Sequence, residues 1–97
     1  MNKLLLLDSV DVQQALADYL RQQRKKAKLS RAALAERSGV PAATIKKFEL
    51  SGQISLRQWL ILWECVDDLK RLYALTQDTE PEKRLPSSIE EVLNDEF

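Results

Sequence analysis

The chain has 97 residues, the length of one small domain, and its 15 basic and 15 acidic side chains cancel. With 44% hydrophobic and 31% charged residues, only 2 glycines and 3 prolines, the composition favours a globular all-α fold. There is no histidine and only one cysteine, Cys65, which argues against an enzyme, a metal site, a cofactor or a disulfide framework. The longest apolar runs are too short to cross a bilayer, and the N-terminus lacks a signal-peptide pattern. We therefore expect a cytoplasmic protein with no membrane partner and no small-molecule substrate.

The charges are unevenly distributed along the chain. Residues 21–57 contain ten basic and two acidic side chains, a net charge of +8. The preceding segment carries −2 and the following one −6. A basic centre between acidic ends indicates a surface for a polyanion, although a solvated basic face is the alternative.

The N-terminal region contains a leucine-rich arm and then a helix. Residues 1–8 include the run KLLLL, which fits a short strand, an apolar arm or the start of a helix, and which a dimer partner could cover. A helix is expected to begin near residues 9–11, capped by Ser9 or Asp11. Its apolar face is predicted to contain Val12, Ala15, Leu16, Tyr19 and Leu20. The basic residues at its C-terminal end interact favourably with the helix dipole. They also suit phosphate contacts, which we assign to Lys26 and Lys28.

The segment from Leu29 to Gly52 predicts a helix, a tight turn and a second helix. Ser30 can cap the first helix, and Gly39 supplies the positive φ that the turn requires. The second helix opens at Pro41, which suits a first helical turn. This order of elements is that of a helix-turn-helix, whose second helix enters the major groove of double-stranded DNA.

The second helix of this pair presents a small, basic outer surface. Ile45 and Phe48 are expected to face the core. The outward positions are Ala42, Ala43, Lys46 and Lys47, with Thr44 near the start. Small side chains permit close approach to the groove and the lysines can reach guanine or phosphate, but bidentate base readout is sparse. We expect phosphate contacts and DNA shape to contribute much of the recognition.

Two further helices are predicted, near residues 56–66 and after Asp67 or Asp68. Five consecutive apolar residues, Trp59 to Trp63, point around the whole axis of the first of them. Leu60 and Trp63 are expected in the core; the alternative is that both tryptophans are core residues. The surplus apolar surface predicts a homodimer interface, to which we assign Trp59, Leu62 and Trp63. The helix-turn-helix domain is thus expected to span residues 9–76.

Residues 77–97 form an acidic linker followed by a short amphipathic helix. Ser88 and Glu91 match a capping box. One helical face carries Ile89, Val92, Leu93 and Phe97. We interpret these four residues as a surface that binds a partner or the domain itself, because a helix this short is marginal alone; a tail without function is the alternative.

Many spaced positions resemble the lambda-repressor-like helix-turn-helix family of the xenobiotic-response-element (XRE) type. They are Leu20-Arg21-x-x-Arg24, Leu29-Ser30-x-x-x-Leu34-Ala35-x-x-Ser38-Gly39-Val40-x-x-x-Thr44-Ile45-x-x-Phe48-Glu49, Gly52 and Ser55-Leu56. The resemblance covers roughly residues 12–75 and implies a compact five-helix domain that dimerises on a pseudo-palindromic operator. It adds Arg31 to the DNA-facing set and implies an internal ion pair between Arg24 and Glu49. Pro41 departs from the family's usual Ser or Thr cap, and Ala42-Ala43 replaces the Gln or Arg of many members.

Within that family, the phrase FELSGQISL, the short chain and the acidic tail resemble HipB-type antitoxins. The resemblance implies a repressor that autoregulates a toxin–antitoxin operon and binds a HipA-like serine/threonine kinase toxin. Two alternatives remain at this point. One is a stand-alone XRE-family or phage-type regulator, and the other is a protein-interaction adaptor that does not bind DNA.

Overall fold

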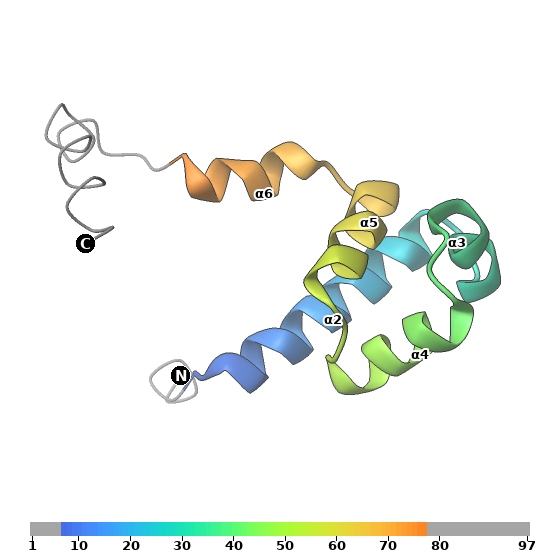
Figure 1. Cartoon of the computed structure of the whole chain (residues 1–97), viewed down its shortest axis with the longest axis horizontal. Coiled ribbons are helices and arrows are strands. Elements are labelled where there is room, and N and C mark those ends of the chain that lie inside the picture. Colours follow the sequence, from blue (N-terminus) through green and yellow to red (C-terminus); the bar gives the residue numbers. More distant parts are fainter. Residues whose placement is uncertain (1–6, 78–97) are drawn as a thin grey trace, which may run out of the picture.

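The computed structural model describes residues 7–77, which form five α-helices (Figure 1). The helices are α2 (Ser9–Lys26), α3 (Arg31–Ser38), α4 (Ala42–Ser51), α5 (Leu56–Val66) and α6 (Leu69–Thr76). No strand occurs in the described part, so the predicted all-α, five-helix fold is confirmed. None of the helices described is long and apolar enough to cross a membrane.

The core lies where α2, α3, α4 and α5 meet, and two connecting loops each contribute one residue to it. Its buried hydrophobic members are Ala17, Leu20, Leu29, Leu34, Val40, Ile45, Phe48, Leu62 and Trp63. In Figure 1, α2 runs beside α4 and α5, and α3 sits at its C-terminal end. The core therefore holds the two helices of the predicted helix-turn-helix against α2 and α5.

Helix α2 is capped one residue earlier than the sequence pattern indicated. Asp8 is the N-cap: its Oδ1 accepts from the Asp11 backbone N–H at 3.0 Å, and its own N–H donates to Asp11 Oδ2 at 3.2 Å. At the other end, Lys28 adopts a left-handed conformation with φ 60°. The Leu29 N–H then donates to the Arg24 carbonyl at 3.1 Å, which closes a Schellman motif. This motif turns the chain directly into α3.

The predicted inner face of α2 was wrong in part. Leu20 is buried and Leu16 and Tyr19 are half-buried, but Val12 and Ala15 are exposed. The buried stripe instead contains Ala17, Leu20 and Arg24. A charged residue in the stripe explains the error, because a search for apolar periodicity assigns arginine to the outer face.

The turn between α3 and α4 follows the sequence prediction. The Ser30 side chain accepts from the Ala33 N–H at 3.0 Å and caps α3. Gly39 ends α3 with φ 80°, and Val40 is 2% exposed beneath the turn. Pro41 is the N-cap of α4 and not a residue of its first turn. Because Pro41 has no side-chain oxygen, α4 begins without a side-chain cap.

The burial pattern of α5 corrects the predicted dimer interface. Leu62 and Trp63 are 0% and 5% exposed inside the monomer, so neither can contact a second subunit. Leu60 was predicted in the core and is only half-buried. Trp59 is half-buried, and its ring lies 5.4 Å from that of Trp63. The most apolar face of α5 packs against α2 and α3, so Leu62 has no exposed surface that could contact a partner.

Helix α6 extends away from the other helices and has no buried residue (Figure 1). Asp68 caps it, and the Asp68 carbonyl accepts from Trp63 Nε1 at 2.9 Å. Asp67 Oδ2 accepts from the Tyr19 hydroxyl at 2.6 Å and from Arg71 Nη1 at 2.8 Å. These polar contacts attach α6 to the domain together with Leu72, which is half-buried and packs against the core. Residues 1–6 of the arm predicted at 1–8, and the four tail positions Ile89, Val92, Leu93 and Phe97, lie outside the described residues.

Two glycines offer a matched test of the helix ends. Gly39 and Gly52 end α3 and α4 with φ 80° and 79°, a conformation that costs an L-residue about 1–2 kcal/mol. A Cβ at Gly39 meets nothing within 4 Å, whereas one at Gly52 meets the Gln13 backbone carbonyl carbon at 3.2 Å. We expect Gly39→Ala to lower the free energy of unfolding by about 1–2 kcal/mol, and Gly52→Ala to lower it further. Urea denaturation measures both, and equal losses would contradict the close approach of α4 to α2.

Candidate nucleic-acid interface

Helix α4 presents one buried face and one exposed face. Ile45 is 0% and Phe48 2% exposed, which confirms their predicted core positions. Of the predicted outward residues, Thr44 is half-buried and the other four are exposed: Ala42, Ala43, Lys46 and Lys47. The outer face therefore has small side chains in its first turn and two ammonium groups in the next. A surface of this shape allows the helix backbone to approach a groove closely.

A buried carboxylate fixes the position of α4. The side chain of Glu49 is 0% exposed and is bound by Arg24 of α2. Arg24 Nε donates to Glu49 Oε2 at 2.7 Å and Nη2 donates to Oε1 at 3.1 Å, a bidentate pair. Arg24 Nη1 donates to the Leu29 carbonyl at 2.9 Å, beyond the end of α2. The ion pair implied by the family resemblance is thus present, and it joins α4 to the helix before the motif.

A second arginine reaches the same carboxylate from α3. Arg31 Nε donates to Glu49 Oε1 at 2.9 Å, and the Arg31 side chain is 31% exposed. Arg31 was predicted to face DNA, and the structure shows that its Nε also performs a structural role. Because only Nε is committed to Glu49 among the described contacts, the exposed part of the guanidinium remains able to meet a phosphate. Two arginines on one carboxylate leave this cluster with a net charge of +1.

The environment of Glu49 acts on its pKa in two directions. Burial raises the pKa because it disfavours the charged carboxylate, while the hydrogen bonds and charges of Arg24 and Arg31 lower it. The combined effect of the two arginines is larger than that of burial, so the pKa of Glu49 is lowered. The carboxylate is therefore charged at neutral pH and contributes to stability there.

The other two predicted DNA contacts lie away from α4. Lys26 is the last residue of α2, and Lys28 occupies the turn before α3; both are exposed. They extend the positive surface to the α2–α3 junction, beside Arg31 at the start of α3. The structure therefore brings Arg24, Arg31 and Glu49 into one cluster, and these lysines lie on the adjoining α2–α3 junction.

Sequence reasoning missed two other interactions. The contact of Arg31 with Glu49 joins residues 18 positions apart and follows no helical periodicity. Arg71 and Asp67 are four residues apart and form an ion pair, but Asp67 lies in the extended connection before α6, so helical spacing does not account for the contact. The Tyr19 hydroxyl that completes this cluster comes from another helix and could not be read from spacing.

The geometry is that of a helix-turn-helix: α3 and α4 are joined by a left-handed glycine, and α4 has an exposed basic face. Residues 15–82 match the helix-turn-helix domain family. The match covers more than half of the 97 residues, and the chain belongs to this family. Comparison with curated proteins gave no match, and neither did comparison with solved structures. Membership of this family indicates that the protein is a regulator that binds DNA.

The buried carboxylate predicts a specific pH dependence. We expect Glu49→Gln to lower the free energy of unfolding by about 3–5 kcal/mol at pH 7, because Arg24 then lacks its buried counter-charge. Since the folded pKa of Glu49 is lowered, its contribution is complete above the ordinary glutamate value of about 4.3 and decreases as the pH falls through the folded value. The difference between wild type and variant should therefore shrink in acid.

Urea denaturation from pH 7 down to pH 3 measures this difference. Glu36→Gln, at an exposed position of α3, is the matched control and should change stability little. A Glu49→Gln loss that stays constant across this range would rule out the ionised pair as its cause.

Proposed function

We propose that the protein is a transcriptional repressor that binds a pseudo-palindromic operator in double-stranded DNA as a homodimer, and that it catalyses no reaction. The observation that carries this proposal is the exposed face of α4, with Ala42 and Ala43 in the first turn and Lys46 and Lys47 behind them. Glu49 holds that face outward through α2 and α3. Such a helix fits a major groove about 12 Å wide.

The small side chains in the first turn of α4 determine which contacts this helix can make with operator bases. Alanines can approach thymine methyl groups, and Thr44 is half-buried, so few side chains offer paired hydrogen bonds to one base. Lys46, Lys47 and the exposed part of Arg31 supply positive charge for phosphates or guanine acceptors. We propose that affinity comes mainly from these charges and specificity from few base contacts and DNA shape.

A pseudo-palindromic operator requires two copies of the domain, because two-fold DNA symmetry is matched by a two-fold dimer. With Leu62 and Trp63 buried, we place the dimer surface on α6. Leu69 and Tyr73 lie four residues apart on one side of this helix and are 39% and 64% exposed. Leu75 is 77% exposed on another side of the helix. A projecting helix with this much exposed apolar area is typical of a subunit interface.

We propose further that the repressor is a HipB-like antitoxin, cytoplasmic, which autoregulates its operon and binds a HipA-like serine/threonine kinase toxin. Its support is the sequence phrase from Phe48 to Leu56, which spans the end of α4 and the start of α5, together with the acidic tail. The tail would supply the toxin contact through Ile89, Val92, Leu93 and Phe97. A stand-alone regulator is the competing proposal.

The lysines of α4 provide the test of DNA binding. We expect Lys46→Ala with Lys47→Ala to abolish binding at physiological salt to DNA from upstream of the protein's own gene, without loss of helix content by circular dichroism. At low salt, where residual binding is measurable, each lost phosphate contact flattens the plot of log affinity against log salt by about 0.9, so the pair should reduce the slope by about 1.8. Arg21→Ala removes an exposed basic side chain from α2, outside both the proposed DNA-binding residues and the proposed dimer surface, and serves as the control. Unchanged affinity in a salt-matched shift assay would exclude α4 as the recognition helix.

Deletion of residues 77–97 separates the antitoxin proposal from the stand-alone regulator. The deletion removes no residue of α2–α6, so operator binding should be retained. Binding to a kinase encoded directly beside the gene, measured by calorimetry, should be lost. A kinase that binds the truncated chain as tightly as the full chain would contradict the role of the tail, and absence of any kinase gene beside this one would favour the stand-alone regulator.

A further inference from the structure

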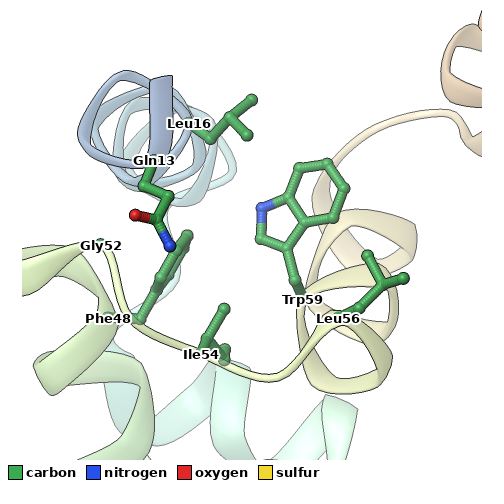
Figure 2. A pocket seen from close by; sticks show the side chains of 7 residues that line it. All are labelled: Gln13, Leu16, Phe48, Gly52, Ile54, Leu56 and Trp59. Carbon is green, nitrogen blue, oxygen red and sulfur yellow. The ribbon is translucent and has the colours of Figure 1, made fainter. Parts of the chain in front are cut away.

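A cavity opens between α2 and α5, away from the exposed face of α4. Its volume is 220 Å³, and Figure 2 shows its lining: Gln13, Leu16, Phe48, Gly52, Ile54, Leu56 and Trp59. Gln13 and Leu16 come from α2, and Leu56 and Trp59 come from the first turns of α5. Apart from Gln13 and the indole N–H, the walls are hydrocarbon. A cavity of about 150 Å³ accepts a benzene molecule, so this one has room for a leucine side chain.

One polar atom at the cavity lacks a partner. Trp59 Nε1 is shielded from solvent and has no hydrogen-bond acceptor among the described residues. In Figure 2 its nitrogen lies on the edge of the indole that is turned toward the cavity. The neighbouring Trp63 differs, because its Nε1 donates to the Asp68 carbonyl at 2.9 Å. A buried N–H without an acceptor costs about 1–3 kcal/mol, so an occupant that brings a carbonyl oxygen is favoured here.

We propose that this cavity is the docking site of the chain's own N-terminal segment, residues 2–6. A leucine side chain of that segment fills the apolar space, and a backbone carbonyl accepts the hydrogen bond from Trp59 Nε1. The inference is independent of the proposed DNA binding and of the proposed toxin.

The length of chain before α2 makes this occupant feasible. The described chain begins at Leu7, and Gln13 and Leu16 follow on the next turns of the same helix. At 1.5 Å of rise per residue, Gln13 and Leu16 lie about 6 and 10 Å along the helix axis from Ser9, the first residue of α2. Five or six extended residues span up to about 20 Å, enough to return to the cavity. The segment brings three consecutive leucines, Leu4 to Leu6, which are costly to leave in water.

The other end of the chain is a poorer fit. The described residues end at Gln77 after α6, which follows the C-terminal end of α5, whereas Leu56 and Trp59 line the cavity from its N-terminal end. Residues 78–97 also carry seven acidic side chains, which an apolar cavity disfavours. The N-terminal segment carries a single charged side chain, that of Lys3.

The two indole N–H signals in a nitrogen-15 NMR spectrum provide the test, with Trp59→Phe assigning them. Deletion of residues 2–6 should shift the Trp59 signal and speed its hydrogen exchange by at least about tenfold, because the N–H loses its acceptor and its cover. The Trp63 signal should stay in place, since its partner is the Asp68 carbonyl. Replacing Leu4, Leu5 and Leu6 together by serine should reproduce the deletion, whereas Val10→Ser, at a 65% exposed position outside the cavity, should not.

Each alternative occupant gives a different outcome that would overturn the proposal. A Trp59 signal that moves on deletion of 78–97, but not of 2–6, would identify the tail as the occupant. A spin label on Lys3→Cys in a Cys65→Ser chain should broaden the Trp59 signal of the same molecule. Broadening seen only when labelled and nitrogen-15 chains are mixed would identify the arm of a second copy. A Trp59 signal that no deletion and no dilution changes would show that the cavity holds no protein segment.

Discussion

The carboxylate of Glu49 is the constraint on which the proposed DNA-binding surface of α4 depends. It has no exposed area, and arginines from α2 and α3 approach it at 2.7 and 2.9 Å. A buried charge without its counter-charges would be strongly destabilising, so the three helices can pack together only in the arrangement that brings these groups together. Ile45 and Phe48 seal the same side of α4 with apolar contacts, which leaves Lys46 and Lys47 on the opposite side. The position of α4 and the exposure of its basic face therefore both follow from the cluster of Glu49 with Arg24 and Arg31.

Features set by local chemistry were predictable from the sequence. Ser30 and Ser55 cap helices because a hydroxyl before a helix satisfies a free N–H, and Gly39 ends α3 because the turn needs a positive φ. The inward positions Ile45 and Phe48 follow from helical spacing between two well-marked ends. The ion pair of Arg24 and Glu49 was implied by the resemblance to a known family and not by spacing, since 25 residues separate the partners.

Features set by the packing of distant elements were not predictable. Five apolar residues in a row give α5 no preferred side, so only the contact with α2 and α3 decides that Leu62 and Trp63 are buried while Trp59 lines a cavity. The same limit explains α2, where the buried stripe ends in a charged Arg24 and leaves Val12 exposed. This burial pattern bears on the proposed dimer, because we assign its surface to α6 and not to α5.

The central claim is that α4, held by Glu49, is the element that meets DNA. An amide NMR titration of the full chain with a duplex from upstream of its own gene tests this claim most directly. The account predicts that the largest shifts fall on Ala42 to Lys47, with smaller ones at Arg31 and at the α2–α3 junction. Shifts concentrated on α6, with α4 unchanged at saturating DNA, would contradict it.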